Sequence, residues 1–260
     1  MNKLFKVFAM AVMLIIGGQI MAQKNENYGA MFLGASIPMN DFKEFDGFDE
    51  FALMSYDEDD AGAGIGFNAG LKWYFNVGVK GLGVMLSMDG FYNGPCEDLK
   101  NAYREMKSTY DGQLIDGSFK YNATPKYINA PVMLGLNYIY NFNPNLGIYV
   151  QAGAGGNIRF ITDMESVNRF TLLGAENQIK ETYDYDVAFS FAYQAGLGFE
   201  VAKKLVIGCS FYDLGSAAVN CEKTVKSKII NDNVTNTDVT YPACGTVHPI
   251  MILGRIGFSF

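Results

Sequence analysis

The chain has 260 residues and a formal net charge of -7, and it is rich in glycine (29) and aromatic residues (14%) but poor in proline (7). The negative balance argues against a nucleic acid as a partner. The length suits a single domain, and frequent glycine and aromatic residues favour short alternating strands in a sandwich or barrel.

The first 22 residues have the pattern of a secretory signal peptide. Lys3 and Lys6 precede an apolar run over 7–16, and the small residue Ala22 stands before Gln23. The apolar run is too short for a comfortable transmembrane helix. We therefore expect cleavage after Ala22, export, and a barrel domain over residues 23–260.

Eight strand-like segments follow in the mature chain. Short turns come after the second, fourth and sixth segments, and long loops come after the first, third, fifth and seventh. The segments are 27–37, 63–76, 82–93, 127–141, 146–161, 184–201, 205–214 and 247–260. Short turns at one end and long loops at the other are typical of outer-membrane barrels. The sequence predicts an all-β, eight-stranded, antiparallel up-and-down transmembrane barrel with long extracellular loops.

One face of these segments is apolar at every second position. In the fourth segment, Val132, Leu134 and Leu136 alternate with Met133 and Gly135. A soluble, lipocalin-like barrel would turn the apolar face inward, and a membrane barrel would turn it outward. A group of aromatic residues on this face near the short turns favours the membrane, because bilayer interfaces select aromatic side chains. This predicted girdle contains Trp73, Phe75, Tyr138, Tyr140, Phe199, Phe258 and Phe260. Only the first segment allows either face to point outward.

Four stretches carry a resemblance to a known family. They are 28–34 (YGAMFLG), 127–134 (YINAPVML), 194–200 (QAGLGFE) and the terminal 257–260 (GFSF). With these, the mature chain resembles the small PorT-like, OmpA-type outer-membrane barrels of Bacteroides-type bacteria. The resemblance implies an integral outer-membrane protein surrounded by lipid and lipopolysaccharide. It also implies that the barrel-assembly machinery reads the end at Phe260.

Charged residues fall on the face that would line the lumen. They are Lys72, Asp89, Arg159, Glu200 and Arg255. Isolated buried charges are costly, so we expect a paired network, with Lys72, Glu200 and Arg255 together near the short turns. One interpretation is that the network fixes a barrel whose lumen is plugged by side chains. The alternative is a gate or ion path, because the many inward glycines could leave a slim cavity.

The first two long loops have different compositions. Residues 38–62 are strongly acidic, and Asp57, Glu58, Asp59 and Asp60 form a candidate cation-binding loop. The alternative is a solvated, self-repelling loop, and no metal motif or cofactor motif is present. Residues 97–110 show helical spacing, which predicts either a short cap on the barrel mouth or a docking surface.

The last long loop predicts a hairpin closed by a disulfide. Residues 224–230 and 234–241 alternate on either side of Asn231, Asp232 and Asn233. A two-residue turn at Asp232 and Asn233 would place Cys221 opposite Cys244, at a distance that a disulfide can bridge. We expect Cys96 and Cys209 to be free thiols.

The function predicted from the sequence is that of a non-enzymatic surface protein that presents its loops to a partner or a polysaccharide. The alternatives are a narrow channel or small-ligand barrel through the lumen, and an accessory barrel of a secretion system. A third class, a lipid-modifying enzyme, would depend on His248, the only histidine, which has no serine two residues on and no acid near it in sequence.

Overall fold

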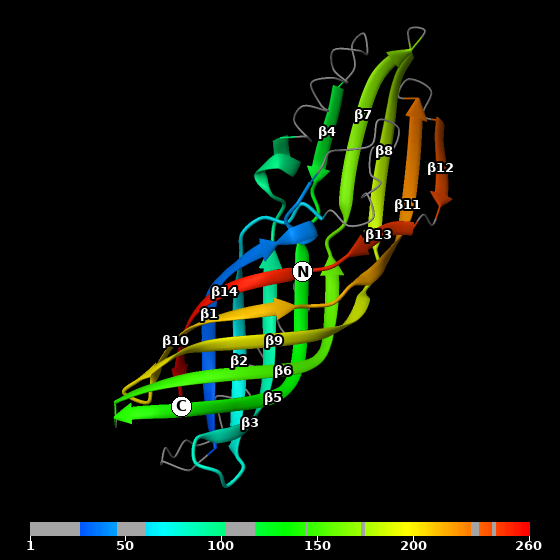
Figure 1. Ribbon diagram of the computed structural model, residues 1–260. Coiled ribbons are helices and arrows are strands. Elements are labelled where there is room, and N and C mark those ends of the chain that lie inside the picture. The colour runs from blue at the N-terminus through cyan, green and yellow to red at the C-terminus, as the bar shows by residue number, and fades with distance from the viewer. Residues whose placement is uncertain are drawn as a thin grey trace.

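The computed structural model describes residues 27–45, 61–101, 118–143, 145–172, 175–229, 234–240 and 243–260. Most of them lie in strands (Figure 1). The elements are β1 (Tyr28–Met39), η1 (Asn40–Phe42), β2 (Gly66–Asn76), β3 (Leu82–Asn93), β4 (Ser118–Ala123), β5 (Tyr127–Asn143), β6 (Leu146–Ile161), β7 (Met164–Leu172), β8 (Ala175–Tyr185), β9 (Ala188–Val201), β10 (Leu205–Asp213), β11 (Ala217–Ile229), β12 (Val234–Thr240), β13 (Ala243–Val247) and β14 (Ile250–Ser259).

Eight of these strands close into an antiparallel barrel in the order β1-β14-β10-β9-β6-β5-β3-β2. Each barrel strand pairs with the barrel strands that come before and after it in sequence, and β14 pairs with β1 to complete the ring. The fold class predicted from the sequence is confirmed. Closure leaves the barrel without a free edge, so the backbone hydrogen bonds of every barrel strand are made within the protein.

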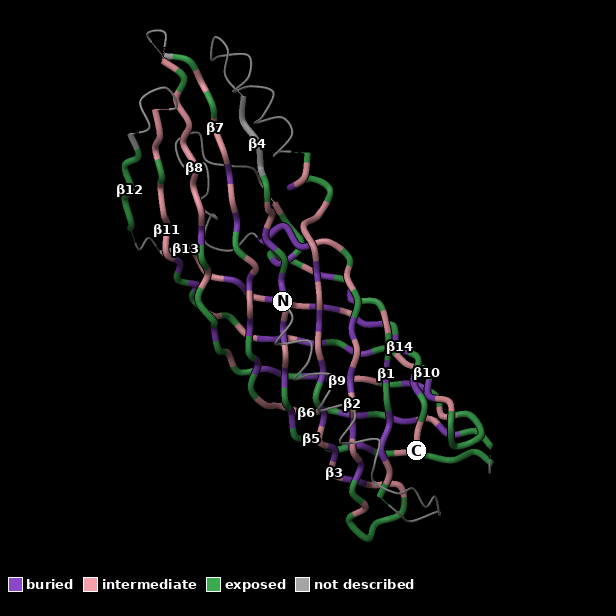
Figure 2. Tube along the Cα trace, turned by 180° about the vertical axis from the view of Figure 1, so that it is seen from behind, coloured by how far each residue is buried: buried purple, intermediate pink, exposed green. Residues whose placement is uncertain are grey.

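The apolar face points outward, as the alternation predicts. Leu134 is 64% exposed and Phe258 is 63% exposed, whereas Met133 between the outward positions of β5 is buried. The orientation of the first strand is now settled, because Ala30, Phe32 and Ser36 are buried. Figure 2 shows the buried and exposed positions alternating along the barrel strands.

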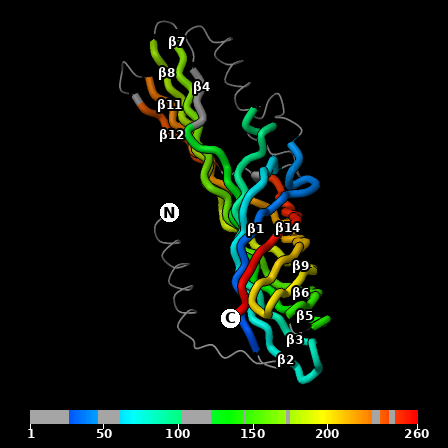
Figure 3. Tube along the Cα trace, turned by 90° about the vertical axis from the view of Figure 1, so that its left-hand side faces the viewer, coloured from blue at the N-terminus to red at the C-terminus, as the bar shows by residue number. Residues whose placement is uncertain are grey.

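A second sheet rises from one end of the barrel, and we call it the protruding sheet. It consists of β12, β11, β8, β7 and β4 in that order, with β13 paired to β11. It extends the barrel wall, since β7 and β8 continue the hairpin of β6 and β9, while β11 follows β10. Figures 1 and 3 show it standing beyond the barrel, at the end away from Phe260.

The protruding sheet corrects two expectations. Most of the long stretch after residue 161 is a strand hairpin rather than a loop. The β11–β12 hairpin has Ile229 opposite Val234, so its register differs by two residues from the one predicted with a turn at Asp232 and Asn233. Extending that register would place residue 242, not Cys244, opposite Cys221.

Helical structure is scarce among the described residues. Residues 97–101 are helical, which agrees with the start of the predicted helix, and 102–110 lie outside the described residues. No helix in the described part of the chain is long and apolar enough to cross a membrane.

Candidate functional site

The lumen contains a buried polar cluster at mid-height. Its centre is an ion pair between strands on different sides of the barrel, with 3.2 Å between Arg255 Nη1 and Asp89 Oδ1. The Tyr212 hydroxyl lies 2.8 Å from Asp89 Oδ2 and 2.5 Å from Gln194 Oε1, and it can donate to only one of them at a time. The Arg255 guanidinium also stacks on the Tyr212 ring, 4.8 Å from its centroid.

Lys72 belongs to the same cluster. Its Nζ donates to Gln194 Oε1 at 3.1 Å, and Gln194 Nε2 donates to Ser87 Oγ at 2.8 Å. The Phe32 ring faces both cations of the cluster, with Lys72 Nζ at 5.6 Å from the ring centroid and Arg255 Cζ at 6.0 Å. One carboxylate, one amide oxygen and two aromatic rings therefore compensate two buried positive charges.

The predicted charge network is only partly assembled. Arg255 pairs with Asp89 rather than with Glu200, because Glu200 lies beside Val206 and Gly257, one inward row nearer the short turns. Arg159 is also buried but lies at the opposite end of the lumen. It donates to the carbonyl oxygens of Gly215 (2.9 Å) and Val247 and to Asn129 Oδ1 (3.2 Å), so it holds loop ends in place.

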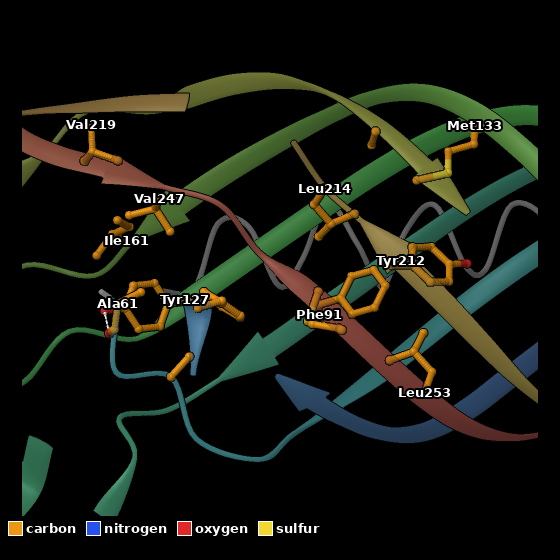
Figure 4. Packing of buried hydrophobic residues seen from close by; sticks show 14 residues of the cluster. Ala61, Phe91, Tyr127, Met133, Ile161, Tyr212, Leu214, Val219, Val247 and Leu253 are labelled. Carbon is orange, nitrogen blue, oxygen red and sulfur yellow. Dashed lines mark hydrogen bonds between the residues drawn. The ribbon is translucent and has the colours of Figure 1, made fainter. Parts of the chain in front are cut away.

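Apolar side chains fill the lumen above and below the polar cluster. The loop-end group is shown in Figure 4, where Tyr127 points toward Ala61 and donates to its carbonyl oxygen. The same group includes Phe91, Leu214 and Val247. The short-turn end is filled by Ala30, Phe32, Tyr74, Met85, Tyr149 and Val206.

The inward glycines make room for this filling rather than for a channel. A Cβ at Gly70 would lie 1.9 Å from Asp89 Oδ1, and one at Gly208 would lie 2.0 Å from the Tyr149 hydroxyl. Glycine at these positions lets large polar side chains from the same part of the wall lie flat across it: Asp89 is the direct partner of Gly70, and Tyr149 is two strands from Gly208. The slim cavity considered from the sequence is therefore occupied by side chains at these points.

The outer surface carries two aromatic belts. The predicted girdle faces outward, with Phe75, Tyr138, Tyr140, Phe199 and Phe258 all exposed and Trp73 and Phe260 half-buried. Phe260 pairs with Gly29 through both backbone groups, and its ring covers that glycine. A second, unpredicted belt lies near the protruding sheet and consists of Phe67, Phe189, Phe191, Tyr193 and Phe211. The alternation of these residues was the signal that could have identified it.

The protruding sheet has two different faces. On one face, the buried Met164 and Tyr183 pack with Leu99 and Cys221, beside Phe45 and Cys96. The other face is polar, and Lys180 Nζ on it forms an ion pair of 2.8 Å with Glu165. The hydrogen bonds from Lys180 and Asn122 lower the pKa of Glu165.

Three carboxylates line the base of this polar face. Glu222 is paired with Asp184, and Asp163 precedes β7 next to it. Partial burial raises the pKa of Asp163, and the hydrogen bond and negative charge of Asp184 raise it further. These carboxylates repel one another, and no group of acids, histidines or cysteines among the described residues has the arrangement of a metal site.

The remaining predicted sites have different outcomes. The candidate cation-binding loop, Asp57, Glu58, Asp59 and Asp60, lies outside the described residues. Cys96 and Cys209 are free thiols. Cys221 is buried, and Cys244 follows Ala243, whose partner in β11 is Asn220.

His248 has an acidic neighbour in space that the sequence did not reveal. Its Nε2 lies 2.8 Å from Asp213 Oδ1. The same oxygen accepts the backbone N–H of Gly215 at 2.9 Å, and Gly215 has a φ of 70°. Asp213 thus stabilises the turn that leaves β10, and the histidine joins this turn to the start of β14.

No protein-family model and no characterised protein sequence matches the chain. Among solved structures, it resembles Ail, the attachment invasion locus protein of Yersinia pestis, with 20% identity, 92% of this chain and 100% of that chain covered, and a TM-score of 0.34. Neisserial surface protein A is 9% identical, with 90% of this chain and 97% of that chain covered and a TM-score of 0.33. A major outer membrane protein from Thermus thermophilus is 10% identical, with 90% of this chain and 99% of that chain covered and a TM-score of 0.39.

Proposed function

We propose that the protein is an integral outer-membrane barrel. The spacing of the two aromatic belts supports this. Phe189 and Phe199 stand at the two ends of the outward face of β9. The ten-residue separation spans about 33 Å along the strand, and a tilt of about 40° reduces it to a height of about 25 Å, the apolar thickness usual for such barrels.

The role that the structure supports best is display of the protruding sheet outside the cell by a closed, non-enzymatic barrel. The observation that carries it is that the lumen is filled while the wall continues past the barrel as a paired sheet. In this orientation, the short turns and Phe260 face the periplasm, and the sheet faces the environment. A partner or a polysaccharide would contact the sheet.

The proposal includes the parts of the sequence prediction that concern biogenesis. A signal peptide would be removed after Ala22, and the barrel-assembly machinery would recognise the strand that ends at Phe260. Lipid and lipopolysaccharide would surround the belts. The strand motifs quoted above are the reason to place the chain with the PorT-like barrels. The secretion-accessory role stays an alternative to display.

We also propose a disulfide between Cys221 and Cys244. Cys244 is one residue beyond Ala243, the partner of Asn220, so the two cysteines are diagonal neighbours across β11 and β13. A bonded Cys221 is supported by the thiols of the described residues, among which Cys96 and Cys209 are free and Cys221 is not. The bond would fix the base of the protruding sheet to β13.

Labelling of intact cells tests the display role. A membrane-impermeant maleimide is applied to Thr237→Cys and Lys203→Cys variants, each with Cys96 and Cys209 replaced by Ser. We expect the Thr237→Cys protein to react on intact cells and the Lys203→Cys protein to react only after permeabilisation. The reverse pattern would contradict the proposed orientation.

Planar-bilayer recording tests the channel alternative. The filled lumen predicts no steady single-channel steps from the wild-type protein. Steps that change in the Arg255→Ala variant would favour conduction through the lumen over display.

A further inference from the structure

Four basic residues gather on the outer part of the polar face of the protruding sheet. They are Arg169, Lys180, Lys226 and Lys228, and we call this set the basic face. Lys226 lies directly opposite Lys180, and Gln178 lies between Arg169 and Lys228 in the adjacent row on the same face. Arg169 and Lys226 are exposed, and Lys180 and Lys228 are partly exposed.

Stability of the sheet does not account for this arrangement. Like charges placed directly opposite each other destabilise an antiparallel sheet. Lysines that protect a sheet from aggregation belong on its edges, but β7, β8 and β11 are interior strands flanked by β4 and β12. Only Lys180 has an ion pair in the described part of this face, with Glu165. The chain as a whole is acidic, so the concentration of positive charge here is local.

We infer that the basic face binds an acidic polysaccharide outside the cell. This inference rests on the proposed function, because it requires the sheet to be outside. Its rows also carry hydroxyl groups, since Thr237 pairs with Lys226 and Thr235 with Lys228. Cations beside hydroxyl groups and an amide suit a chain that carries both negative groups and sugar hydroxyls.

The position of the basic face argues against membrane headgroups as the ligand. Lys180 is seven residues before Val187, the outermost exposed apolar position of that hairpin, so it stands about 20 Å along the strand from the apolar outer face of the barrel. The row formed by Asp184 and Glu222 lies between them and repels anionic headgroups. Among the described residues of these rows, no aromatic side chain offers the stacking surface that single-stranded nucleic acids use.

Binding of dextran sulfate to the mature protein in nanodiscs tests the inference, with unsulfated dextran of the same length as the neutral probe. The test variant is Arg169→Gln/Lys226→Gln/Lys228→Gln. The control is Lys80→Gln/Lys203→Gln/Lys204→Gln, which removes the same charge from exposed residues at the short turns. Migration of unheated samples in SDS gels verifies that each barrel is folded.

We expect salt-sensitive binding of dextran sulfate, no binding of dextran, and affinity about tenfold weaker for the test variant than for the wild type. The control should stay within twofold of the wild type, and Lys226→Arg/Lys228→Arg should retain binding. Equal loss in test and control variants would overturn the inference, as would absence of binding. The inference would also be overturned if dextran sulfate did not bind and the test variant differed from the wild type in oligomeric state. The basic face would then be the contact surface for a second copy of the chain. If the maleimide pattern holds and dextran sulfate does not bind, the display role survives and this inference fails.

Discussion

Asp89 and Arg255 form an ion pair through the lumen, although their strands, β3 and β14, share no edge in the barrel. The two residues lie far apart in the sequence and join different parts of the wall. Because both are buried, each depends on the other for charge compensation. The pair is therefore a test of how the filled lumen stabilises the barrel.

Removing one member of this pair should destabilise the barrel strongly. We expect Asp89→Asn and Arg255→Gln each to lower the free energy of unfolding by about 3–5 kcal/mol, since each leaves a buried charge without its partner. The double variant should lose less than the sum. Urea titration of the protein folded in lipid vesicles measures this, and strict additivity would show that the two side chains are independent.

The glycine beside Asp89 should be intolerant of a methyl group. Gly70→Ala would push against Asp89 Oδ1, so we expect a loss of about 1–3 kcal/mol in the same titration. Gly156→Ala is the matched control, because a Cβ there has no neighbour within 4 Å. Equal effects of the two substitutions would mean that crowding in the lumen is not what selects glycine at position 70.

The outward face should reject charge. Leu134→Lys places an ammonium group on the apolar outer face of β5, and we expect it to lower the free energy of unfolding in bilayers by about 2–4 kcal/mol. Val239→Lys on the protruding sheet is the control, since Val239 is also exposed but lies outside that face, and its effect should be near zero. A small cost for Leu134→Lys would indicate that this face meets water.

The carboxylates at the base of the protruding sheet should make its stability depend on pH. The pKa of Asp163 is raised above its ordinary value of 3.8, first by partial burial and then by Asp184. A raised carboxyl pKa means that the folded state holds the proton more tightly. The contribution of protonated Asp163 to the stability of the folded sheet is therefore complete below about pH 4, and it is lost as the pH rises through the raised pKa.

Hydrogen-exchange protection of β7 and β8 measures this dependence. From about pH 4 to about pH 7, Asp163 should make the protection of the wild type fall relative to that of Asp184→Asn, which removes one negative charge, while the lowered pKa of Glu165 acts in the opposite direction in both proteins. Identical profiles for the two proteins would contradict the assigned repulsion.

The thiols of the protein test the disulfide. Alkylation without a reductant should modify Cys96 and Cys209 and leave Cys221 and Cys244 unmodified, and reduction should release both. Alkylation of Cys221 in the unreduced, denatured protein would rule the bond out.

The sequence was most informative where one face of a strand meets a uniform environment. Strands such as β5 and β14 alternate cleanly because one face points outward and the other lines the lumen, and their predicted ranges lie within a few residues of the observed ones. The hairpin of β7 and β8 was missed because both of its faces carry polar residues. The period of two is then too weak to distinguish a strand from a loop.

The lumen was harder to predict than the strands. That Asp89 faces inward follows from alternation, but its contact with Arg255 depends on strand tilt and stagger around the ring. Glu200 was therefore an incorrect choice of partner. The register of β11 and β12 was also missed, because residue preferences suggested a turn at Asp232 and Asn233, whereas the pairing of Ile229 with Val234 shifts the register by two residues.

The proposed membrane location requires lipid to be the solvent of the outer face. Nitroxide labels at 132–136 of β5, attached in lipid vesicles to single-cysteine variants, measure oxygen accessibility residue by residue. We predict high accessibility at 132, 134 and 136 and low accessibility at 133 and 135, because oxygen concentrates in the hydrocarbon layer. The opposite phase, or high accessibility to a water-soluble relaxation agent at 134, would contradict a lipid-facing exterior.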